Sequence, residues 1–164
     1  MRLTTARLAT GFALAALVVV PAIGTAAPAA AATTTFSGSC NISGELFYPV
    51  SGSGHVGPET LLRADGVCNG SLDGGPSASH PVTGGGWTVD GQFLAQLSYM
   101  PLTASGVGSF TFANGETLEF SMQQILLATT VTGQGGGFAI GTISGWGGDT
   151  AHLSLTTLGP LTSG

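Results

Sequence analysis

Residues 36–48 read FSGSCNISGELFY, and the spacing of their side chains decides the fold class. Every second residue is apolar or small, and the residues between them, from 37 to 45, are Ser, Asn or Glu. Alternation with a period of two is typical of a β-strand with one buried face and one solvent-facing side. The stretch therefore predicts a long strand that contributes one face to a core.

Strand-like runs recur along the rest of the chain. They fall at 61–72, 87–89, 93–99, 104–112, 117–122, 125–131, 138–146 and 151–158. Turn-rich segments, among them Gly84–Gly86, separate several runs, and no stretch has the periodicity of an amphipathic helix. This pattern predicts an all-β fold: a single, mostly antiparallel β-sandwich or β-barrel of about eight strands.

The segment Phe110–Phe120 predicts one hairpin in detail, because Asn114-Gly115 is a turn signal. A two-residue loop would leave both faces of the hairpin mixed. A three-residue loop, 113–115, pairs Phe110 with Leu118 and makes one face apolar. Since the register of a hairpin follows its buried face, we expect the three-residue loop, with its Gly in the left-handed conformation.

Residues 1–32 have the three parts of a secretory signal peptide: two arginines, an apolar run, and small residues that end at Ala32. The apolar run is too short for a membrane-spanning helix. We expect cleavage after Ala32, with cleavage after Ala26 as the alternative. Residues 33–164 would then form a single exported β domain that is secreted and has no membrane contact.

Loss of this segment leaves an acidic chain of 132 residues. One Arg remains against eight Asp and Glu, which gives a net charge of −7 with His neutral. Such a chain lacks the positive footprint that nucleic acid requires, and it is repelled by anionic lipid. We therefore exclude a nucleic-acid partner. We interpret the negative charge as an acidic surface that keeps the protein soluble.

Cys40 and Cys68 are the only two cysteines of the chain, and both lie in the exported part. An even pair in an oxidising compartment predicts one disulfide, which would close a loop of 29 residues. Two cysteines alone do not complete a metal site. We therefore expect a Cys40–Cys68 disulfide and no metal.

No motif in the chain points to a cofactor or to catalysis. Gly52–Gly57 matches G-x-G-x-x-G, but no helix follows it, so we expect no dinucleotide and no other cofactor. Glu45 and Glu119 lie on the polar faces of expected strands, where a solvated surface role is ordinary. We expect no catalytic residues. A secreted hydrolase with paired carboxylates or a Ser/His pair is the less favoured alternative.

The two tryptophans have glycine neighbours: Trp87 follows three glycines, and Trp146 lies between two. A Trp flanked by Gly is either a core residue that needs room or an exposed platform that stacks on a sugar ring. Ser and Thr make up 32 of the 132 exported residues, which suits hydrogen bonding to uncharged ligands. Trp87 and Trp146 are therefore our candidate ligand-binding residues.

Three segments with Gly, Ser and Cys patterns, 35–44, 66–72 and 104–112, resemble small exported β-rich proteins of high-GC actinomycetes. The members of this group have no known function. The resemblance implies export and a β fold, and it carries no catalytic residue to this chain.

These observations predict a secreted, non-catalytic β domain that binds a neutral extracellular ligand such as a polysaccharide. The alternative is a protein-binding or structural protein, for instance an inhibitor or coat component, whose partner is an extracellular protein. A large exposed apolar patch would favour that alternative.

Overall fold

The computed structural model describes residues 33–47, 58–94, 100–145 and 149–164. The expected signal peptide, the Gly52–Gly57 motif and Trp146 lie outside the described residues. Every element within the described ranges is a β-strand, so none is a helix with the length and apolar character to cross a membrane. The all-β expectation is confirmed.

Nine strands follow one another along the described chain. They are β1 (Thr35–Phe47), β2 (Glu59–Leu72), β3 (Ala78–Leu94), β4 (Met100–Phe112), β5 (Thr117–Ile125), β6 (Ala128–Gly133), β7 (Phe138–Ser144), β8 (Thr150–Thr157) and β9 (Leu161–Thr162).

Two expected strand boundaries are wrong. Gly84–Gly86, expected as a turn, lies inside β3, because its glycines bend the strand without ending it; Gly85 has a φ of 94°. The expected run 125–131 is divided between β5 and β6 by a tight turn at Leu126, whose φ is 54°.

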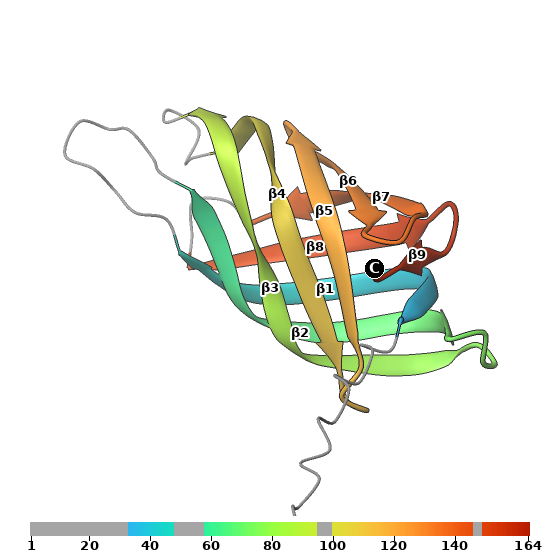
Figure 1. Ribbon diagram of the computed structural model, residues 1–164. Coiled ribbons are helices and arrows are strands. Elements are labelled where there is room, and N and C mark those ends of the chain that lie inside the picture. The colour runs from blue at the N-terminus through green and yellow to red at the C-terminus, as the bar shows by residue number, and fades with distance from the viewer. Residues whose placement is uncertain (1–32, 48–57, 95–99, 146–148) are drawn as a thin grey trace, which may run out of the picture. The chain divides into compact units, whose positions relative to one another are not determined.

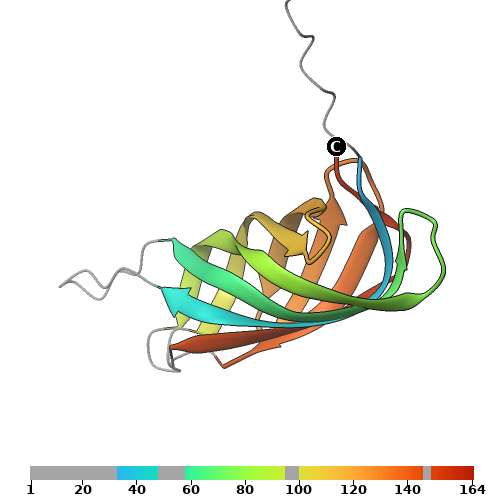
Figure 2. The ribbon, with the colours of Figure 1, turned by 90° about the horizontal axis from the view of Figure 1, so that it is seen from below.

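The strands form a closed antiparallel barrel (Figure 1, Figure 2). Each strand from β1 to β8 pairs with its neighbours in sequence, and β1 closes the circle by pairing with both β2 and β8. The short strand β9 pairs with the start of β1, where Leu161 lies opposite Phe36. The architecture is therefore an eight-strand barrel with one extra strand, and not a sandwich.

The barrel interior is apolar because inward and outward side chains alternate along the strands. In β5, every second residue from Leu118 onward is buried and those between are exposed. Four phenylalanines, each 1% exposed or less, gather near the β4–β5 turn: Phe36, Phe110, Phe112 and Phe120. The ring centroids of Phe110 and Phe120 are 4.7 Å apart, and those of Phe36 and Phe112 are 6.0 Å apart. This end of the barrel is filled by side chains.

Cys40 on β1 and Cys68 on β2 lie directly opposite each other and form the expected disulfide. Both residues belong to the buried core. The bond joins two strands that are neighbours in the sheet, and it is compatible with an oxidising compartment.

The predicted β4–β5 hairpin is confirmed in its register. Phe110 pairs with Leu118, and both side chains are buried. The backbone N–H of Phe112 donates to the carbonyl of Glu116 (2.9 Å), which closes a three-residue loop. Gly115 has a φ of 89°, the left-handed conformation expected of it.

Candidate functional site

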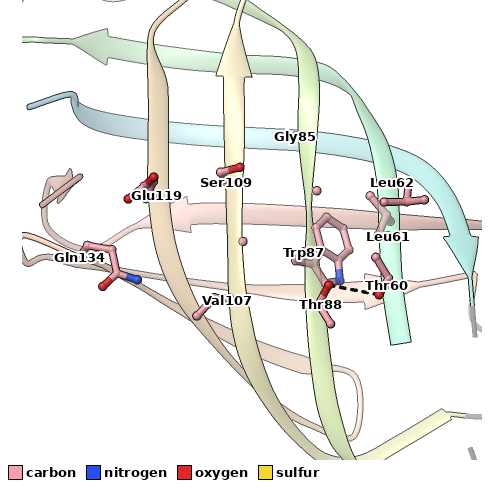
Figure 3. Close-up of a pocket in the computed structure, with 12 residues that line it drawn as sticks. Thr60, Leu61, Leu62, Gly85, Trp87, Thr88, Val107, Ser109, Glu119 and Gln134 are labelled. Carbon is pink, nitrogen blue, oxygen red and sulfur yellow. Dashed lines mark hydrogen bonds between the residues drawn. The ribbon is translucent and has the colours of Figure 1, made fainter. Parts of the chain in front are cut away.

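A groove of about 480 Å³ lies on the outer surface of the barrel across β2, β3, β4 and β5 (Figure 3). Its lining consists of Thr60, Leu61, Leu62, Gly85, Gly86, Trp87, Thr88, Val107, Gly108, Ser109, Glu119 and Gln134. Five of these residues are exposed outward-facing side chains that ligands could reach directly: Leu62, Thr88, Val107, Glu119 and Gln134. We call this feature the β2–β5 groove.

The groove exists because the ladder between β2 and β3 is interrupted. Paired residues end at Leu61–Trp87 and resume only at Gly66–Val82. Gly86 lies in this gap, and a Cβ atom there would overlap the carbonyl oxygen of Leu61. Glycine is therefore required for the strands to approach at this point, and the missing side chain leaves part of the hollow.

Trp87 forms part of the groove lining, but its side chain belongs to the core. It is 2% exposed, and within the described chain its indole Nε1 has no hydrogen-bond partner. A ring that is buried to this degree does not offer a free face for stacking on a sugar. The ligand-binding role expected for Trp87 and Trp146 stays a prediction, without stacking by Trp87, and Trp146 lies outside the described residues.

Hydroxyl groups form one row across the groove. Thr60 on β2, Thr88 on β3 and Val107 on β4 are successive cross-strand partners. The hydroxyls of Thr60 and Thr88 are hydrogen-bonded at 3.1 Å, as the dashed line in Figure 3 shows. This row presents two hydroxyls beside the exposed aliphatic side chain of Val107, which is 60% exposed.

A second row carries the one charged side chain found among the described lining residues. Gly86, Ser109 and Glu119 are successive cross-strand partners on β3, β4 and β5. Gln134, just after β6, lies beside Glu119: its backbone N–H donates to the Glu119 carbonyl at 3.4 Å. Its side-chain amide donates to the hydroxyl of Ser121 at 3.5 Å. Carboxylate, amide and hydroxyl groups therefore line this side of the groove.

The chemistry available in the groove is hydrogen bonding to an uncharged polar ligand. Carboxylate oxygens accept hydrogen bonds, amides both donate and accept, and hydroxyls do either. Leu62 and Val107 add apolar surface that suits the C–H groups of a ring. Among the described residues that line this groove, Glu119 is the one titratable side chain, and none of the others offers a second carboxylate for two-carboxylate hydrolysis.

Two other glutamates, Glu45 and Glu116, lie away from the groove. Glu45 forms an ion pair with Arg63 at 2.8 Å, in which both side chains are more than half exposed. Glu116 accepts from the side-chain amide of Asn114 (2.7 Å) at the β4–β5 turn. Neither lines the groove, so neither lies beside Glu119 there.

A smaller hollow of about 300 Å³ lies over β1, β7 and β8. It is lined by Asn41, Ile42, Ser43, Thr142, Ser144, His152, Leu153 and Ser154. His152 is the cross-strand partner of both Ser43 and Ser144, but no carboxylate is among the lining residues. In the part of the chain that the structure describes, no three His, Cys, Asp or Glu side chains lie together as a metal site would require.

Sequence analysis missed the groove because its polar residues come from four strands and a turn. Their proximity depends on strand order and register, which periodicity does not give. The glycines before Trp87 were the available signal, since they mark the place where the pairing of β2 with β3 is interrupted.

Comparison with known proteins identifies no relative: no family model, no curated protein and no solved structure matches this chain.

Proposed function

We propose that residues 33–164 form an exported, non-catalytic β-barrel that binds a neutral, hydroxyl-rich extracellular ligand, a segment of polysaccharide, in the β2–β5 groove. The observation that carries the proposal is the composition of the groove. It combines hydroxyls, an amide and a single carboxylate with apolar side chains in one open hollow of about 480 Å³.

This combination matches the surface of a sugar ring, which has hydroxyls around its edge and C–H groups on its faces. Glu119 and Gln134 can accept from and donate to neighbouring hydroxyls, while Leu62 and Val107 contact the C–H groups. The open form of the groove suits a polymer, because a chain longer than the groove can lie across it. Binding then requires no exposed aromatic ring.

Thr88→Tyr tests the proposal, because a large side chain would fill the groove from an exposed strand position. Thr156→Tyr on β8 is the matched control: it is also an exposed strand threonine, but lines neither the groove nor the hollow over β1, β7 and β8. The protein with its Cys40–Cys68 disulfide formed is sedimented with insoluble cellulose, chitin, starch and bacterial cell wall.

We expect the wild type and Thr156→Tyr to sediment with at least one polymer, and Thr88→Tyr to bind it about tenfold more weakly or not at all. The proposal is wrong if none of the neutral polymers, cellulose, chitin and starch, retains the wild type. It is also wrong if Thr88→Tyr binds as well as the control.

A second candidate function, binding of an extracellular protein, is favoured by one surface feature. Phe138 and Ile140 both point outward from β7, and Leu158 adjoins them, since its backbone N–H donates to the Phe138 carbonyl at 2.9 Å. Each of the three side chains is 47% exposed or more. Adjacent exposed apolar side chains of this size are typical of protein-interaction surfaces.

The double substitution Phe138→Ser/Ile140→Ser separates the two candidates. We call Phe138, Ile140 and Leu158 the β7 strip. If a protein partner binds the β7 strip, the wild type and Thr88→Tyr both retain that protein from culture fluid, and the double variant does not. Equal retention by all three proteins would remove the strip from consideration.

A further inference from the structure

Glu119 is the one charged side chain among the described residues that line the β2–β5 groove. It is exposed on β5, opposite Ser109 and beside Gln134. No Arg, Lys or His lines the groove, and in the described part of the chain the one ion pair, Arg63–Glu45, does not involve it. The carboxylate therefore faces the groove without a compensating cation.

A carboxylate in this position affects ligands according to their charge. Its two oxygens accept hydrogen bonds from two adjacent hydroxyls of a neutral sugar, and charge-assisted hydrogen bonds are stronger than neutral ones. A ligand carboxylate in the same place can donate nothing and is repelled. The neighbouring amide of Gln134 carries no charge, so it does not neutralise the carboxylate of Glu119.

We infer that Glu119 sets the charge of the ligand that the groove accepts: polymers with neutral, adjacent hydroxyls bind, and polymers that carry carboxylates are excluded. This inference rests on the proposed function and adds a specificity-determining residue to it. Glu119 acts by contact with the ligand and carries out no reaction.

The net charge of the chain offers a competing explanation, because an acidic protein repels an anionic polymer wherever the polymer approaches. A matched control distinguishes the two explanations. Asp149 is an exposed acid just before β8, which is not a groove strand. Asp149→Asn and Glu119→Gln change the net charge by the same amount, but only Glu119→Gln changes the groove.

The experiment compares each neutral polymer of the sedimentation panel that retains the wild type with the same polymer after oxidation of its primary hydroxyls to carboxylates. We expect the wild type and Asp149→Asn to bind the oxidised polymer about fivefold more weakly, the scale of one exposed charge–charge contact. Glu119→Gln is expected to bind both forms within about twofold. The wild-type preference is expected to shrink in 1 M salt, where the screening length is about 3 Å.

Equal binding of both polymer forms by the wild type overturns this inference and leaves the proposed function standing. The inference is also overturned if Asp149→Asn restores binding of the oxidised polymer as strongly as Glu119→Gln does. If no neutral polymer retains the wild type, the proposed function itself fails, and the inference fails with it.

Discussion

Two strand junctions of the barrel, β5–β6 and β2–β3, are both antiparallel but differ in regularity. Between β5 and β6, six successive residue pairs run from Phe120–Gly133 to Ile125–Ala128 without a shift. Between β2 and β3, the pairing stops at Leu61–Trp87 and resumes at Gly66–Val82. The regular junction has no gap in its pairing, whereas the interrupted junction forms one wall of the groove.

Polar atoms without partners occur at both junctions, in different surroundings. At β5–β6, Gln124 Oε1 and Thr129 Oγ1 are cross-strand neighbours with no hydrogen-bond partner among the described residues, and both side chains are 2% exposed or less. At β2–β3, the unpartnered atom is Trp87 Nε1, at the groove lining. We interpret the unpartnered oxygens of Gln124 and Thr129 as a cost to stability. The β2–β3 junction, in contrast, is part of the ligand site that we propose.

The largest expected effect comes from the disulfide that joins β1 to β2 beside the interrupted junction. Cys40→Ser/Cys68→Ser opens a link between residues 28 positions apart, so the unfolded chain gains conformational freedom. We expect the free energy of unfolding to fall by about 3–4 kcal/mol. Urea unfolding of the variant and of the oxidised wild type measures the difference. A loss below about 1 kcal/mol in the free energy of unfolding would contradict this expectation. It would mean that the hydrogen-bonded pairing of β1 with β2 is enough to stabilise this part of the barrel without the disulfide.

The next effect tests the gap itself. Gly86→Ala places a Cβ atom against the Leu61 carbonyl, and we expect a loss of about 2 kcal/mol in the free energy of unfolding, together with weaker polymer binding. Gly84→Ala is the control, because the nearest atom to its new Cβ would be Thr111 Cβ at 3.7 Å, an ordinary contact. The explanation of the gap is wrong if the two variants are equally stable.

The smallest effect has the opposite sign and belongs to the regular junction. Gln124→Met and Thr129→Val each replace a buried side chain that carries one unpartnered oxygen by an apolar side chain of similar size, so each is expected to stabilise the barrel by up to about 1 kcal/mol. Gln123→Met, at the exposed neighbouring position, is expected to change stability by less than about 0.5 kcal/mol. Thermal unfolding of the three variants measures these changes. Destabilisation by both core substitutions would show that the two polar groups have partners in solution.

Local patterns predicted the elements whose register depends on nearby residues. The β4–β5 hairpin follows from Asn114-Gly115 and the apolar residues on either side, and β1 follows from the alternation of residues 36–48. The disulfide followed from the cysteine count, and its two residues proved to lie on paired strands.

Closure of the barrel depends on contacts that local patterns do not contain. The pairing of β1 with β8 joins residues more than one hundred positions apart, for instance Cys40 with Leu155. Alternating strands fit a sandwich as well as a barrel, so sequence left that choice open. The direction of the Trp87 side chain was open for the same reason, since its burial depends on how β3 bends at Gly85 and Gly86.

The central claim, that the β2–β5 groove binds a neutral carbohydrate chain, is tested most directly by backbone amide NMR of the oxidised protein. A neutral oligosaccharide of the polymer that retains the wild type is the added probe. We predict chemical-shift changes concentrated at Thr60, Thr88, Ser109 and Glu119, with the β7 strip around Phe138 and Ile140 unaffected. Chemical-shift changes confined to the β7 strip or to the hollow around His152 would contradict the account. The absence of any change at saturating oligosaccharide would contradict it as well.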